Sequence, residues 1–173
     1  MADSTKRRAA TRAEARALSH PLRLRILRLC LYDARTNKEL ADELGVDPSS
    51  TLYHVRALVR TGFLKPQRRR RGKRGAVEIP YRATGKSWTL DVGADESVLV
   101  ATLDAYRGEL LEAGPDNVLT STRIGVRLKP DRLAELRRRL RDLAHEFADA
   151  DDADGEAVSL YLGLHERGDK EKP

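Results

Sequence analysis

One short segment of the chain, residues 49–60, carries polar side chains of the kind that bind the edges of base pairs. If the segment is helical, Ser50, Tyr53 and His54 share one face at about 100° per residue, with Arg56 beside them. This face mixes hydrogen-bond donors with acceptors and is uncharged at its centre, which suits a major groove. The alternative is a polar exterior that contacts nothing. The apolar residues of the opposite face are expected to be buried: Leu52, Val55, Leu58 and Val59.

A dense run of positive charge follows this segment. Seven residues between Lys65 and Arg74 are lysine or arginine, and two strand-like stretches flank this glycine-containing run. Cations at this density repel one another unless phosphates neutralise them, so a phosphate or minor-groove contact is expected. A solvated loop or a localisation signal is the alternative. With the start of the preceding helix, the candidate contacts to double-stranded DNA are Thr36, Asn37, Ser49, Ser50, Thr51, Tyr53, His54, Arg56, Arg68, Arg69, Arg70, Arg71, Lys73 and Arg74.

Two consecutive helix starts would position these residues. Thr36 and Glu39 have the spacing of a capping box, in which the hydroxyl accepts a backbone N–H bond and the carboxylate reaches back to the cap. Gly45 stands where a left-handed residue ends a helix. Asp47 and Pro48 then suit the N-cap and first position of a second helix. A helix, a glycine-containing turn and a second helix are the parts of a helix-turn-helix, and the basic hairpin after them is expected to be its wing.

Residues 18–90 resemble the ArsR-type winged helix-turn-helix regulators of bacteria. The matching stretches are LSHPLRLRIL at 18–27, TNKELADELG at 36–45, STLYHVRALVRTGFL at 50–64 and the basic hairpin. The resemblance implies a homodimer whose two recognition helices enter successive major grooves of a pseudo-palindromic operator, with repression the commonest outcome. The cysteine pairs of arsenic- and cadmium-sensing relatives are absent from residues 36–44, which removes the usual basis for a thiol-metal sensor.

The charge of the chain is divided unevenly. Residues 1–90 hold 21 Lys and Arg against 8 Asp and Glu, a net +13, whereas residues 91–173 hold 12 against 19, a net −7. The positive half is the half with the helix-turn-helix, as expected for a surface that binds nucleic acid. The N-terminus lacks the apolar stretch of a signal peptide and no run is long enough to span a membrane, so a cytoplasmic location is expected. Cys30, the single cysteine, is interpreted as a small core residue.

The second half predicts further helices and strands. Residues 95–113 read as an amphipathic helix, and residues 121–128 and 157–164 alternate between apolar and polar side chains as strands do, with a helix from Pro130 between them. Two strands alone are marginal, so we expect them to pair and to pack against a helix or a dimer mate. In ArsR-type regulators the helix after the wing is the dimerisation helix, although packing within one chain is the alternative here. The residues expected at the dimer interface are Leu99, Leu103, Tyr106 and Leu110.

The predicted fold is α+β, with a winged helix-turn-helix domain followed by a smaller helix-strand-helix-strand region. The predicted boundaries place a disordered basic tail at 1–10, the DNA-binding domain at 11–90 and a dimerisation and effector domain at 91–173.

These features favour a sequence-specific DNA-binding transcriptional regulator that acts as a homodimer, most often a repressor. The alternative is a winged-helix protein–protein interaction module without specific DNA binding. No enzyme activity and no cofactor are predicted, because the chain lacks a Gly-rich phosphate loop, a nucleophile elbow and zinc-ligand spacing. The sequence does not identify an effector, and an unknown small-molecule ligand and a partner protein are the alternatives. One face of a predicted helix carries four possible metal ligands, Asp142, His145, Glu146 and Asp149. Such residues are more often the solvated side of an amphipathic helix than a metal site, so no metal site is predicted there.

Overall fold

The computed structural model describes residues 7–72, 77–152 and 154–166, and the chain forms two compact units, Met1–Leu119 and Thr120–Pro173. The boundary therefore falls later than the one predicted at residue 90. The reason is that the long helix α5 (Glu96–Ala113) packs against α2 (Pro21–Leu29) within the first unit. The side chains of α5 buried in this way are Val98, Ala101 and Ala105.

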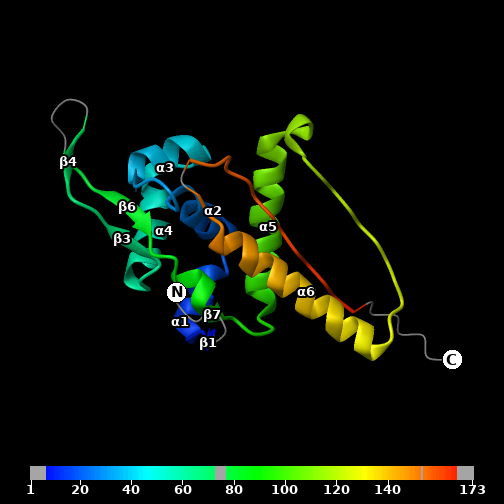
Figure 1. The fold of residues 1–173 in the computed structure, drawn as a ribbon. Coiled ribbons are helices and arrows are strands. Elements are labelled where there is room, and N and C mark those ends of the chain that lie inside the picture. Colours follow the sequence, from blue (N-terminus) through cyan, green and yellow to red (C-terminus); the bar gives the residue numbers. More distant parts are fainter. Residues whose placement is uncertain (1–6, 73–76, 153, 167–173) are drawn as a thin grey trace. The chain divides into compact units, whose positions relative to one another are not determined.

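The helices that carry the candidate site begin and end where their caps predict. Figure 1 shows these helices, α3 and α4, next to the wing. The Thr36 hydroxyl accepts the Glu39 amide at 3.2 Å, and the Glu39 carboxylate accepts the Thr36 amide at 2.8 Å. Gly45 is left-handed with φ 63°, which ends the helix. Asp47 accepts bonds from the first amides of the next helix. The predicted helix-turn-helix is thus present as α3 and α4, and the bounds of the helices before the wing are α1 Arg12–Leu18, α2 Pro21–Leu29, α3 Asn37–Leu44 and α4 Pro48–Arg60.

The predicted wing is an antiparallel hairpin that extends away from the helices in Figure 1. Its base is the pairing of β3 with β6, in which Leu64 lies opposite Ala83 and Pro66 opposite Tyr81. Strand β2 pairs with the other edge of β6, and β4 pairs with β5 farther out along the hairpin. The bounds of these strands are β2 Arg35–Thr36, β3 Leu64–Pro66, β4 Arg70–Arg71, β5 Val77–Glu78 and β6 Pro80–Ala83.

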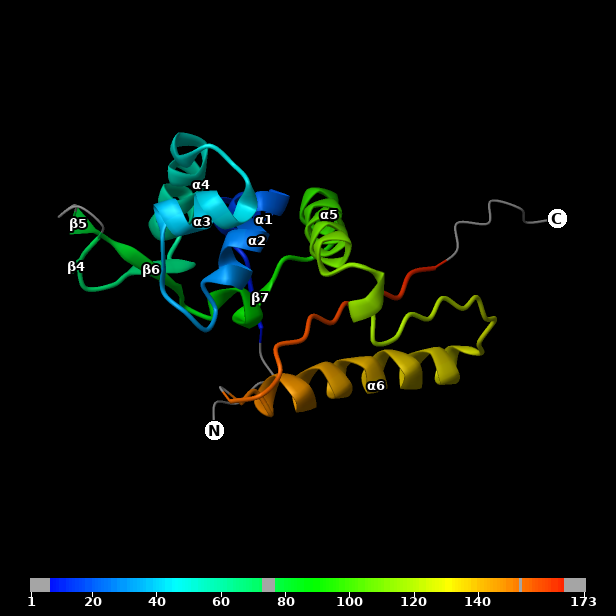
Figure 2. The same cartoon turned by 90° about the horizontal axis from the view of Figure 1, so that it is seen from above.

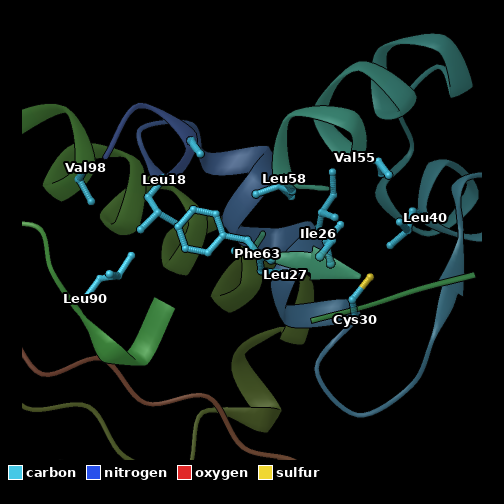
Figure 3. Packing of buried hydrophobic residues seen from close by; sticks show 12 residues of the cluster. Leu18, Ile26, Leu27, Cys30, Leu40, Val55, Leu58, Phe63, Leu90 and Val98 are labelled. Atoms are coloured by element: carbon cyan, nitrogen blue, oxygen red, sulfur yellow. The ribbon is translucent and has the colours of Figure 1, made fainter. Parts of the chain in front are cut away.

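One apolar cluster holds the helices against the base of the wing. Phe63, at the junction of α4 and the wing, keeps 1% of its surface exposed and lies in the middle of the cluster (Figure 3). Ile26 of α2 and Leu58 of α4 are fully buried beside it. Because α4 shares this core with β3, the orientation of the helix and that of the wing are fixed together. Other members of the cluster are Leu18, Leu27, Cys30, Leu40, Val55, Leu64, Leu90 and Val98.

The end of the predicted disordered tail is ordered. Strand β1 (Arg8–Ala9) pairs in parallel with β7 (Leu90–Asp91), which follows the short 3-10 turn η2 (Lys86–Thr89). Buried Glu14 holds this corner together, with its Oε1 2.6 Å from Arg8 Nη2 and 2.7 Å from Lys86 Nζ. The prediction of disorder was therefore wrong for residues 8–10. They are held by the pairing of β1 with β7 and by the ion pair between Arg8 and Glu14. Residues 1–6 lie outside the described part of the chain.

Replacing Glu14 by glutamine is expected to lower the Tm at neutral pH. The difference in Tm between the wild type and this variant should shrink as the pH falls. Hydrogen bonds from Arg8 and then Lys86 hold the pKa of Glu14 well below its ordinary value. A depressed folded-state pKa contributes stability that is present above the unfolded pKa of about 4.3 and is lost as pH falls through the folded value. Circular dichroism melts over a pH series measure this.

Asp42→Asn is the control for this experiment, because Asp42 is an exposed acidic residue of α3 in the same unit. It should leave the Tm unchanged. A Glu14→Gln difference that stayed constant down to the lowest pH would contradict an ionic origin.

Among its described residues the second unit contains one helix, α6 (Pro130–Asp149), with extended chain on both sides of it. The 3-10 turn η3 (Pro115–Asn117) closes the first unit. The strands predicted at 121–128 and 157–164 are not formed, which corrects that detail of the fold. Alternation creates an apolar face, but a strand also needs a partner backbone in register, and the ladders in the described residues all lie in the first unit. The predicted combination of helices and sheet around a winged helix-turn-helix is confirmed.

Candidate nucleic-acid interface

The exposed side of α4 carries four of the predicted contacts to DNA. Ser49, Ser50 and Arg56 are exposed, and Tyr53 keeps 64% of its surface open to solvent. Asp47 fixes the first turn by accepting the Ser49 amide at 2.8 Å and the Ser49 hydroxyl at 2.5 Å. The Tyr53 hydroxyl both donates and accepts, so it can match several base edges. These four side chains are accessible, and their contact with DNA stays a prediction.

Two predicted contacts on the same helix, Thr51 and His54, are buried and cannot reach a groove. Thr51 is fully buried and its hydroxyl donates to the Asp47 carbonyl at 3.0 Å, while His54 is only 7% exposed. Leu52, expected inside, is instead half-buried. The buried face is thus rotated toward Thr51 and His54, because α2 packs against this side of α4. Helical spacing alone could not place the packing partner.

A polar contact beneath α4 explains how His54 is accommodated. The Arg23 Nε–H donates to His54 Nδ1 at 3.2 Å, and the His20 ring lies 4.3 Å from the His54 ring between centroids. Burial, and then the charges of His20 and Arg23, lower the pKa of His54 to about 4. His54 is therefore neutral near pH 7 and joins α4 to α2. Sequence reasoning missed Arg23, because an arginine in an amphipathic helix is usually solvated.

The predicted contacts at the start of α3 also hold the fold together. Thr36 is 3% exposed and its hydroxyl is used in the capping box. Asn37 Nδ2 donates to the Pro48 carbonyl at 2.9 Å, which ties α3 to α4. The Asn37 Oδ1 is buried and has no hydrogen-bond partner among the described residues. The side chains of Thr36 and Asn37 therefore make connections within the helix-turn-helix, and a phosphate contact through the backbone N–H groups at the start of α3 stays a prediction.

The arginines of the wing differ in their contacts. Arg68, Arg69 and Arg71 are exposed. Arg70 instead pairs through Nη2 with the Glu39 carboxylate of α3, and its Nε lies 3.7 Å from Glu78 Oε2 of β5. Arg70 thus holds the wing near α3, a role that the uniform basic run concealed. The predicted contacts Lys73 and Arg74 lie outside the described residues.

Helix α5 leaves one side uncovered. Leu99 is 54% exposed, Leu103 42% and Leu110 39%, and Tyr106 is half-buried. The opposite side packs on α2, where Arg25 pairs with Glu112. The four residues predicted at a dimer interface therefore lie on the side of α5 that its own unit does not bury, apart from the partly covered Tyr106.

Other chemistry is limited in the described residues. Burial raises the pKa of the Cys30 thiol to about 12, so the thiol is protonated and unreactive at neutral pH. Residues 7–72, 77–152 and 154–166 contain no group of three potential metal ligands. Within the same residues no helix has the length and apolarity required to cross a bilayer.

The fold and the exposed basic surface define a winged helix-turn-helix, a class of domain that binds DNA. Residues 18–67 match a family described as a helix-turn-helix domain. No curated protein matches the chain.

The chain is also similar to several solved structures. Reduced HlyU from Vibrio cholerae N16961 is 19% identical, with 53% of this chain and 80% of that chain covered and a TM-score of 0.36. The E41A mutant of ZitR from Lactococcus lactis is 18% identical, with 73% of each chain covered and a TM-score of 0.34. Lactococcus lactis ZitR, described as a zinc-responsive MarR family member, is 16% identical, with 85% of this chain and 83% of that chain covered and a TM-score of 0.30.

Proposed function

We propose that the protein is a sequence-specific DNA-binding transcription regulator of the ArsR type, a repressor that acts as a homodimer on a pseudo-palindromic operator. The observation that supports this most is the combination of exposed Tyr53 on α4 with exposed arginines on the adjacent wing. Both belong to one compact unit, and the Arg70–Glu39 ion pair links the wing to the helix-turn-helix.

In this proposal α4 is the recognition helix. Ser50, Tyr53 and Arg56 offer donors and acceptors to base edges in the major groove. The exposed wing arginines Arg68, Arg69 and Arg71 neutralise phosphates beside it, which adds affinity without sequence preference. The uncovered side of α5 joins two copies, so that two recognition helices reach two half-sites.

The test is fluorescence anisotropy of the full chain with DNA from immediately upstream of its own gene, against a scrambled duplex, over a salt series. A preference of about a thousandfold or more that persists with salt supports a specific regulator. Equal and steeply salt-dependent binding of both duplexes would contradict specific recognition of that DNA and favour an interaction module with a basic surface.

Tyr53→Ala is expected to lower the preference for the specific duplex by about ten- to a hundredfold, with little change in binding to the scrambled duplex. The reason is that exposed Tyr53 contacts bases in this proposal, while its contact with buried His54 is one edge-on ring contact at 5.2 Å between centroids. Competition anisotropy with both duplexes measures the ratio.

His54→Ala is the matched comparison at the next position. It should leave the unpaired Arg23 Nε–H under α4 and lower the free energy of unfolding by about 1–3 kcal/mol. Its specificity, measured on the folded fraction, should stay near that of the wild type. A loss of preference in His54→Ala without destabilisation would instead return His54 to the base-reading surface.

A further inference from the structure

Three arginines from three different helices gather beside the exposed side of α4. They are Arg16 in the last turn of α1, Arg23 of α2 and Arg60 in the last turn of α4, and we call them the arginine cluster. Arg16 and Arg60 are exposed, and Arg23 is half-buried. Arg60 follows Tyr53 by two helical turns, so both side chains lie on the same side of α4. The arginine cluster therefore adjoins the surface that is proposed to read bases.

Hydrogen bonds fix the guanidinium of Arg23 between α1 and α4. Its Nη1 donates to the Arg16 carbonyl at 2.9 Å and to the Ala17 carbonyl at 3.4 Å. Its Nε donates to His54 Nδ1 at 3.2 Å. Its Nη2 has no hydrogen-bond partner in the part of the chain that the structure describes. Because a guanidinium is a rigid, planar group, these bonds fix Nη2 as well and leave it able to donate to a further acceptor.

The arginine cluster has no acidic partner among the described residues, although other arginines of the first unit pair with carboxylates. Burial lowers the pKa of Arg23, and Tyr53 raises it. The charges of Arg16 and Arg60 lower this pKa further, so the three guanidinium groups are close enough to repel one another. Arginine stays protonated at neutral pH. An anion bound beside the cluster would offset this repulsion.

The place of the arginine cluster suits the phosphates of DNA bound by α4. Figure 2 shows the wing on one side of α4, and α1 and α2 on the other. A helix that lies in the major groove is bordered by a phosphate backbone on each side, because helix and groove are both about 12 Å wide. Arginine binds phosphate through charge-assisted hydrogen bonds. The wing and the arginine cluster are therefore placed to contact the two backbones that border one groove.

We propose that Arg16, Arg23 and Arg60 bind backbone phosphates of the operator on the side of α4 that faces α1 and α2. Arg16 and Arg60 each neutralise one phosphate, and Arg23 donates to one of these phosphates through Nη2. The proposal rests on the proposed function, because the ligand is the same DNA, and it adds a contact outside the helix-turn-helix and its wing. A phosphate contact carries no sequence preference, so the cluster should strengthen binding to every duplex.

Glutamine at both Arg16 and Arg60 tests the arginine cluster and leaves the contact between Arg23 and His54 in place. The affinity of the full chain for the upstream duplex and for the scrambled duplex is measured by anisotropy over a salt series. The slope of log affinity against log salt should fall by nearly two, and both duplexes should bind roughly 50-fold more weakly at about 0.1 M salt. Melting should match the wild type, because both side chains are exposed.

Arg137→Gln with Arg141→Gln is the control, because it removes the same charge from exposed positions of α6. The control should keep the wild-type slope. Equal losses of slope in the two double variants would overturn the proposal, because net charge alone would then explain the effect. A wild-type slope in the cluster variant would also overturn it.

The same data separate this proposal from the proposed function. A wild type that prefers the upstream duplex, with a cluster variant that keeps the wild-type slope, overturns the arginine cluster as a phosphate contact and leaves the regulator standing. A wild type that binds both duplexes equally, with the slope lowered in the cluster variant alone, supports the phosphate contact and contradicts specific recognition of that DNA.

Discussion

Alanine at the three exposed wing arginines, Arg68, Arg69 and Arg71, is expected to weaken binding to every duplex by roughly several hundredfold at about 0.1 M salt, and hardly at all at about 1 M. Each arginine that neutralises a phosphate of B-DNA adds about 0.9 to the slope of log affinity against log salt, so the slope should fall by nearly three. Arg70 is left in place because it pairs with Glu39 and positions the wing. Anisotropy over a salt series measures both quantities.

The control for the wing variant removes the same charge elsewhere. Arg137, Arg138 and Arg141 are exposed residues of α6, and their replacement by alanine lowers the net charge equally. This control should change the salt slope little, since counterion release requires contact between arginine and phosphate. Equal losses of slope in the two variants would mean that net charge alone drives binding, and the assignment of the wing would then be wrong.

Aspartate at Leu99 and Leu103 is expected to reduce affinity for a duplex with two half-sites by roughly 10²–10⁴-fold. Both leucines lie on the side of α5 that its own unit leaves uncovered. In a two-fold interface the aspartates would be buried without partners, which is costly. Two recognition helices would then no longer be held at the spacing of two half-sites.

The measurement compares duplexes with one and two half-sites, together with sedimentation of the free protein. The variant should bind the two duplexes equally, whereas the wild type should prefer the longer site. Ala113→Asp, at the exposed end of the same helix, is the control and should keep the wild-type preference. If the double variant keeps that preference, α5 does not set the spacing between the two recognition helices. A variant that stays dimeric but loses the preference would mean that α5 sets the spacing of the recognition helices without being the contact that holds the two copies together.

The local architecture of the DNA-binding unit could be predicted because its signals act over a few residues. Thr36 with Glu39, and Asp47 with Pro48, each fix a helix start within a single turn of backbone. Gly45 ends α3 for the equally local reason that it adopts a left-handed conformation. The basic hairpin and the exposed position of Tyr53 followed from the same patterns.

The sequence by itself therefore determined the helix-turn-helix, its wing and the exposed position of Tyr53. The tertiary structure alone decided which polar residues stay accessible. His54 is covered through Arg23 and Arg70 is held by Glu39, and each pair is 31 residues apart in the chain. The spacing of residues within one helix cannot predict such contacts, because they depend on how separate elements pack against each other. Likewise, alternation in the second unit marks a face to be covered, but a ladder forms only where a partner backbone lies beside it.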